Sequence, residues 1–76
     1  MIFLTGVLVR KPFTIGQRTD RDAIVLEVDT KDYLIKYEPH NFTENEIYNL
    51  EGKVITCRGT LKNSCVFHMT EFTTED

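Results

Sequence analysis

Five apolar segments of strand length, separated by short polar stretches, account for most of the 76-residue chain. They are rich in Ile, Val, Leu, Phe and Tyr, which are typical of β-strands. We place the strands at residues 1–11, 23–29, 33–37, 53–61 and 65–72. A chain of this length builds one core. We therefore expect a single domain over residues 1–72, with residues 73–76 as a frayed tail.

The first segment contains a glycine in its middle and a proline just after its end. A β-bulge at Gly6 would bring the apolar residues on both sides of it onto one face. Pro12 cannot donate a ladder hydrogen bond and is expected to end the strand. Residues 13–22 are then expected to form a loop.

Two hairpins follow from the turn residues. A turn at Thr30-Lys31 pairs Val28 with Tyr33, and a turn at residues 62–64 pairs Leu61 with Cys65. The inner face of the first hairpin would then hold Ile24, Leu26, Val28, Tyr33, Ile35 and Tyr37. The inner face of the second would hold Cys57, Gly59, Leu61, Cys65, Phe67 and Met69.

A helix start signal lies between the third and fourth strands. Thr43 and Glu46 have the spacing of a capping box, and Phe42 is placed to pack against Ile47 as a hydrophobic staple. Gly52 is expected to end this helix, which is about two turns long. A helix this short must dock on the sheet to be stable.

The order of three strands, a short helix and two strands resembles the oligonucleotide/oligosaccharide-binding fold, the OB-fold. Gly6 in the first strand, residues 52–61 in the fourth and Phe67-His68-Met69 in the fifth are similar to that fold. The resemblance extends over residues 1–72. The expected class is thus mostly all-β, as a small five-stranded Greek-key barrel with a helix between strands 3 and 4. An SH3-like barrel is the alternative.

The OB-fold resemblance implies a surface for single-stranded nucleic acid on strands 2 and 3, between the loops after strands 1 and 4. Cations for phosphates and aromatics for bases are the residue types such binding needs. The candidate residues are Arg10, Lys11, Phe13, Arg18, Arg21, Lys36, Arg58 and Lys62. The net charge of −3 argues against coating duplex DNA through bulk charge, so the basic stretch after strand 1 would act locally.

Each candidate also has a structural interpretation. The early cations could pair with Asp20, Asp22 and Glu27, and Lys36 could pair with Glu27. Phe13 could plug the barrel end. Tyr33 and Tyr37 share the parity of Ile35, which favours packing over base stacking.

No catalytic motif, phosphate loop or zinc-ligand spacing occurs in the sequence, so we expect no enzyme activity, no metal and no cofactor. His40 and His68 are expected to be structural or solvated. Cys57 and Cys65 are too far apart in the predicted pairing for a disulfide. With no signal peptide or membrane span, we expect free thiols and a cytoplasmic protein. The alternative function is a protein-interaction module or homodimer that uses a sheet edge or outward groups such as Val25, Leu34 or Val54.

Overall fold

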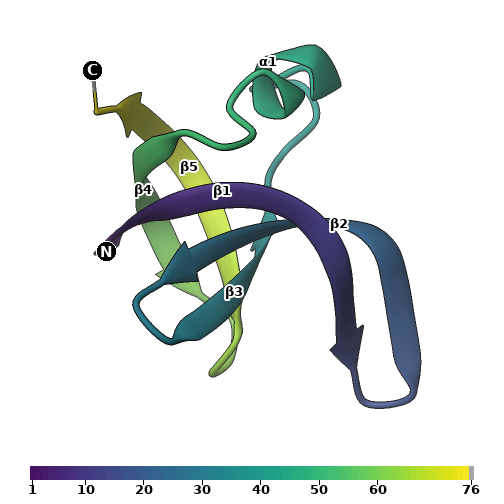
Figure 1. Ribbon diagram of the computed structural model, residues 1–76. Coiled ribbons are helices and arrows are strands. Elements are labelled where there is room, and N and C mark those ends of the chain that lie inside the picture. Colours follow the sequence, from purple (N-terminus) through teal and green to yellow (C-terminus); the bar gives the residue numbers. More distant parts are fainter. Residues whose placement is uncertain (76) are drawn as a thin grey trace.

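The computed structural model describes residues 1–75 as a single closed sheet of five strands with one short helix (Figure 1). The elements are β1 (Ile2–Ile15), β2 (Arg18–Val28), β3 (Lys31–Lys36), α1 (Glu44–Tyr48), β4 (Val54–Leu61) and β5 (Val66–Thr74). The strands close in the order β1-β2-β3-β5-β4. Every neighbouring pair is antiparallel except β3 and β5, which are parallel. The predicted all-β class is confirmed.

Strand β1 closes the barrel because it pairs with β4 through its first half and with β2 through its second. The pairing with β4 runs without a break from Ile2 to Val7, so the bulge predicted at Gly6 is wrong. Gly6 instead permits close packing, because a Cβ there would lie 2.2 Å from the carbonyl oxygen of Glu27. Simple alternation through Gly6 turns Leu4 and Leu8 toward the main core.

The prediction that Pro12 ends the first strand is also wrong. The register with β2 shifts between Lys11 and Phe13, so Pro12 lies at a β-bulge. Proline has no N–H, and a bulge is a position where a strand tolerates the absence of that donor. Residues 13–15 and 18–20 then pair as a two-stranded ribbon in place of the expected loop. Gly16 has a φ of 61°, as the first central residue of a two-residue type II′ turn requires.

The β2–β3 hairpin turns one residue earlier than predicted. Val28 pairs with Lys31 and Leu26 with Tyr33, so Asp29 and Thr30 form the turn. Asp29 adopts a φ of 54°, which Asp tolerates better than Thr because Thr is β-branched. The shift preserves the alternation, so the predicted set of residues still faces the main core.

Helix α1 begins as predicted. Thr43 is the N-cap: its hydroxyl accepts from the Glu46 N–H at 3.1 Å, and the Glu46 carboxylate accepts from the Thr43 N–H at 3.2 Å. The helix proper has five residues, fewer than expected, and turns carry the chain on to Gly52. Ile47 and Leu50 are buried in the main core, so the helix segment covers one end of the barrel (Figure 1).

The β4–β5 turn is longer than predicted. Residues 62–65 lie between the two strands, and Leu61 pairs with Phe67 rather than with Cys65. The inner-face positions predicted for Leu61 and Cys65 are therefore wrong. Leu61 is exposed, and Cys65 packs outside the barrel. A second bulge lies between Arg58 and Gly59. Strand β5 continues through residues 73 and 74 into the expected tail, and residue 76 lies outside the described residues.

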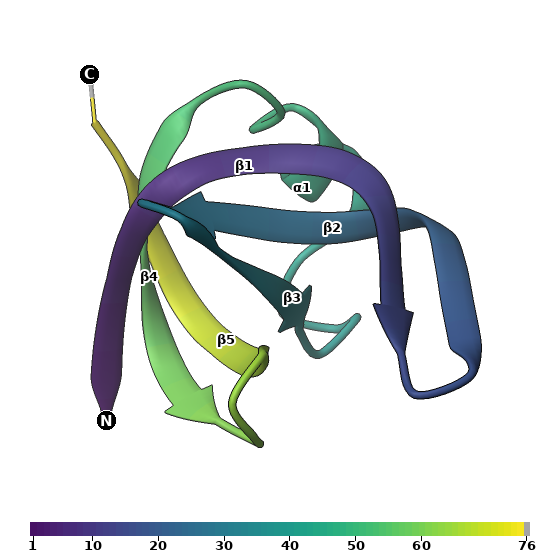
Figure 2. The ribbon, with the colours of Figure 1, turned by 60° about the horizontal axis from the view of Figure 1, so that its bottom comes forward.

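The apolar residues form two clusters. The main one fills the barrel and includes Phe67, Leu26 and Ile55. The second lies on the other face of β2 and β3, where Val25 and Leu34 are almost fully buried. The sequence analysis placed Val25 and Leu34 outward, and they do lie outside the barrel, but they are buried there. Val9, Phe13 and Cys65 pack against this cluster, and the β1–β2 ribbon bends down beside β3 (Figure 2).

Candidate nucleic-acid interface

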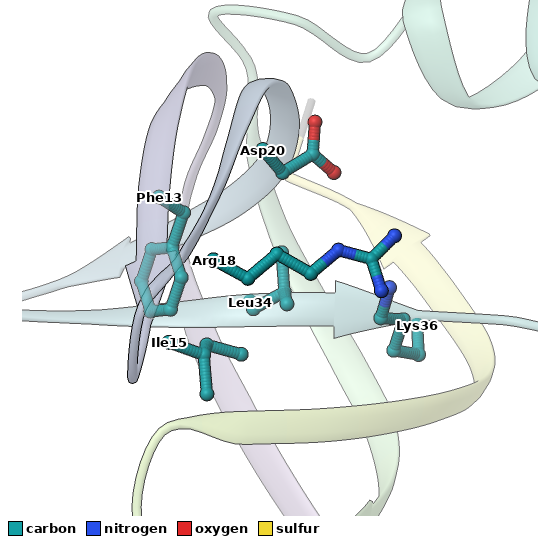
Figure 3. Close-up of a pocket in the computed structure, with 6 residues that line it drawn as sticks. All are labelled: Phe13, Ile15, Arg18, Asp20, Leu34 and Lys36. Carbon is teal, nitrogen blue, oxygen red and sulfur yellow. The ribbon is translucent and has the colours of Figure 1, made fainter.

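A cavity of about 310 Å³ lies between the β1–β2 ribbon and the outer face of β3 (Figure 3). We call it the slot. It is lined by Phe13, Ile15, Arg18, Asp20, Leu34 and Lys36. Its volume is at the lower end of the range of small-ligand sites, about 300–1,000 Å³. The lining combines three apolar side chains, two cations and one carboxylate.

Strand alternation explains why these six residues meet. Phe13 pairs with Asp20 and Ile15 with Arg18, so all four project from one face of the ribbon. On β3, Leu34 and Lys36 project outward because Tyr33 and Ile35 face the barrel. The slot is therefore bounded by a face of the ribbon on one side and by the outer face of β3 on the other.

The base of the ribbon is held by packing and ion pairs. Phe13 is half-buried against the second cluster, which anchors one wall. The Lys11 ammonium lies 2.7 Å from a carboxylate oxygen of Glu27 and 2.7 Å from one of Asp32. These contacts tie β1 to β2 and β3 next to the bulge. Phe13 does not plug the barrel end, since it lies outside the barrel.

Two of the cations predicted to bind phosphate, Arg10 and Lys11, form ion pairs with carboxylates of this chain. Arg10 pairs with Asp22 and its guanidinium carbon lies 4.1 Å from the centre of the Tyr48 ring. The hydrogen bond to Asp22 raises the pKa of Arg10, and the hydrogen bonds to Asp32 and Glu27 raise the pKa of Lys11. Both side chains act as structural links between elements, as the structural interpretation of the early cations anticipated.

Arg18 and Lys36 make no ion pair with any described residue, and both line the slot. In Figure 3 their charged ends point toward the same side of the slot. Two cations that converge without an ion-pair partner can attract an anion to this side of the slot, whereas Asp20 adds one negative charge to the same lining. Lys36 does not pair with Glu27, because Glu27 lies opposite Asp32 at the other end of β3, where it pairs with Lys11. Arg21 is exposed and lies outside the slot lining.

The two remaining candidates, Arg58 and Lys62, lie apart from each other. Arg58 is 3.3 Å from Glu71 across the β4–β5 ladder and borders a different hollow. Lys62 is exposed in the β4–β5 turn, whose last residue, Cys65, accepts a hydrogen bond from the Leu34 N–H at 2.8 Å. This turn and the β1–β2 tip project from the same side of the barrel, with β3 between them (Figure 2).

The two sheet tyrosines are not part of the slot. Tyr33 and Tyr37 are half-buried against the main core, which favours the packing interpretation. Burial also raises the pKa of Tyr37. The sequence analysis did not identify Ile15, Leu34 and Asp20 as residues that line the slot. The alternation of side chains along paired strands could have shown that these residues face the same side. Using it required knowing that residues 13–20 form a two-stranded ribbon.

A smaller hollow, of about 100 Å³, lies between the start of β1 and the β4–β5 ladder. Its lining is Phe3, Thr56, Arg58, Glu71, Phe72 and Thr73. Phe3 is 65% exposed, and Met1 beside it is 69% exposed. Val54 is also exposed, whereas Val25 and Leu34, the other outward groups predicted as contacts, are buried.

Outside the slot, the described part of the chain has few side chains placed for metal binding or covalent chemistry. Residues 1–75 contain no group of three or more His, Cys, Asp or Glu side chains placed to hold a metal ion. Nor does any helix within those residues have the length and apolar character needed to cross a membrane. His68 lies 3.8 Å from Glu38, and the two cysteines are free. Burial raises the pKa of Cys57 to about 12.

Comparison with protein-family models, with curated proteins and with solved structures finds no match to this chain.

Proposed function

We propose that this domain is an OB-like barrel that binds single-stranded nucleic acid in the slot, without catalysis. The strand order β1-β2-β3-β5-β4 with a helix between β3 and β4 supports the first part. The slot's position on the outer face of β3, between the β1–β2 tip and the β4–β5 turn, supports the second. OB-folds bind oligonucleotides between the equivalent loops.

The observation that carries the proposal is one cavity that holds an aromatic ring and two unpaired cations. A base can stack on Phe13, and phosphates can contact Arg18 and Lys36. Stacking is available to every base, and duplex DNA keeps its bases stacked on each other. The slot therefore favours a single strand.

The net charge of −3 limits the strength of this binding. Electrostatic attraction is then local to the slot, where Arg18 and Lys36 carry the positive charge. We therefore propose weak binding whose affinity falls steeply as salt rises.

A fluorescence-anisotropy titration with labelled single-stranded DNA and RNA, at about 50 and 200 mM salt, tests the proposal. We expect saturable binding that weakens at the higher salt. Phe13→Ala should weaken binding at least about fivefold, because stacking on an aromatic contributes about 1–3 kcal/mol per base. No saturable binding at the lower salt would refute the proposal.

The matched control for Phe13→Ala is Phe3→Ala. Phe3 is also an aromatic on β1, but it is more exposed and borders the other hollow. It should leave nucleic-acid affinity unchanged. Because Phe13 packs on the second cluster, thermal melting must show that Phe13→Ala is folded at the titration temperature.

A second candidate function is supported by the exposed apolar residues at the start of β1. Met1, Phe3 and Val54 leave apolar surface in water next to a hollow, as expected where a protein partner or a second copy of this chain docks. Sedimentation velocity over a wide concentration range tests self-association. A constant monomer mass would exclude the homodimer, and a mass that falls on Phe3→Ala would support it.

We also propose a reducing compartment such as the cytoplasm. The free thiols of Cys57 and Cys65 support it, since oxidising compartments favour disulfides in domains of this size.

A further inference from the structure

We infer that the slot prefers guanine, with the Asp20 carboxylate accepting hydrogen bonds from the base edge. The inference rests on the proposed function, because it concerns the base that stacks on Phe13. Asp20 is the one acidic residue in the slot lining, beside Arg18 and Lys36. A carboxylate repels phosphate, so its presence there calls for a ligand group that donates hydrogen bonds.

Asp20 is free to accept such bonds. It makes no ion pair with any of residues 1–75, although Arg18 and Lys36 share the slot with it. Its Oδ1 atom accepts from the Asp22 N–H at 3.2 Å, which restrains the direction of the carboxylate. A carboxylate has about four lone-pair positions, so most of its accepting capacity remains unused.

The register places this carboxylate beside the stacking platform. Asp20 is the cross-strand partner of Phe13, and side chains opposite each other on one face of a ladder have Cβ atoms about 4.5–5.5 Å apart. A ring stacked on Phe13 therefore has one edge near Asp20. Figure 3 shows Phe13 along one wall of the slot and Asp20 on the same ribbon.

Guanine offers the edge that fits a carboxylate best. Its N1–H and N2–H donors point the same way and can bind both carboxylate oxygens at once. Adenine and cytosine offer one exocyclic donor beside a ring acceptor, and thymine or uracil offers one donor between two acceptors. The acceptors face the carboxylate unfavourably. The order expected is guanine first and thymine or uracil last.

The test uses thymidine oligomers of about ten nucleotides, which is within the site size of an OB domain. The central position is thymidine, guanosine or inosine, and binding is followed by anisotropy at low salt. We expect the guanosine oligomer to bind about tenfold more tightly than the all-thymidine one. Inosine, which lacks the N2 amino group, should lose most of that gain.

Asp20→Asn should reduce the preference for guanosine to about twofold or less and leave all-thymidine affinity equal or slightly higher. An amide pairs one donor with one acceptor, so it no longer matches two donors. Asp29→Asn is the matched control, since Asp29 is exposed in the β2–β3 turn and lies outside the slot lining. It should keep the preference.

The outcomes separate the two ideas. Oligomers that bind with equal affinity, or a preference that survives Asp20→Asn, would overturn the guanine inference and leave the proposed function standing. A protein that binds no oligomer would refute the proposed function, and the guanine inference would fall with it.

Discussion

Neutralising the two cations in the slot should flatten the salt dependence of binding. The change is Arg18→Gln with Lys36→Gln, which removes the two unpaired charges that line the cavity. Each phosphate contact to a single strand contributes about 0.7 to the slope of log affinity against log salt, so losing two contacts should lower the slope by about 1.4. Between about 50 and 200 mM salt this corresponds to roughly a sevenfold smaller loss of affinity.

The assay is anisotropy with a labelled thymidine oligomer at several salt concentrations. Lys31→Gln with Lys53→Gln is the matched control, because both lysines are exposed, neither lines the slot, and the change in net charge is the same. Its slope should stay close to that of the parent protein. Equal flattening in both double variants would show that binding depends on overall charge and would refute the role of the slot.

Three further predictions concern the fold. Gly59→Ala should lower the free energy of unfolding by about 1–3 kcal/mol in a urea melt, because the added Cβ would lie 1.9 Å from the His68 carbonyl oxygen. The control is Thr60→Ala at the neighbouring exposed position, which should change the free energy of unfolding by less than about 0.5 kcal/mol. Equal effects of the two variants would contradict the close packing at Gly59. Thr43→Ala removes the N-cap and should cost about 1 kcal/mol in the same assay, so an unchanged midpoint would contradict the capping box. At pH 8, iodoacetamide should modify Cys65 much faster than Cys57, as followed by mass spectrometry. The reaction needs the thiolate, and Cys57 is buried with a pKa of about 12. Equal rates would place Cys57 outside the core.

Local signals in the sequence were sufficient for the short helix and for the class of fold. The capping box at Thr43 and Glu46 depends on residues three positions apart, and it forms as predicted. The strands are found where apolar residues alternate, because one face of each packs in the barrel. Even where the β2–β3 turn is shifted by one residue, the same side chains face inward, since alternation fixes the face.

The ribbon at residues 13–20 could not be found this way. Most of its residues are polar and exposed, and few of its side chains are buried. The ribbon therefore lacks the regular alternation of apolar and polar residues that identifies a strand. A proline inside a strand normally argues against the strand, and only the bulge makes Pro12 compatible with it. Leu34 is buried in a cluster with Val25, Val66 and Phe13, which come from three other strands, so local sequence could not predict its burial either.

The candidate site was predicted in part. Phe13, Arg18 and Lys36 meet in the slot, drawn together from three strands. Arg10, Lys11 and Arg58 do not, because each pairs with a carboxylate at least twelve positions away in the chain. Such pairings depend on strand register, and the predicted β2–β3 register was off by two residues. Charge spacing in a sequence therefore identifies cations without showing which of them are free.

The most direct test of the proposed slot is a ¹⁵N-labelled NMR titration with a thymidine oligomer of about ten nucleotides. We predict that backbone amide shifts will concentrate in residues 13–20 and 34–36, which form the two walls. Shifts centred instead on Phe3, Thr56 and Phe72, or no shifts at low salt, would contradict the account.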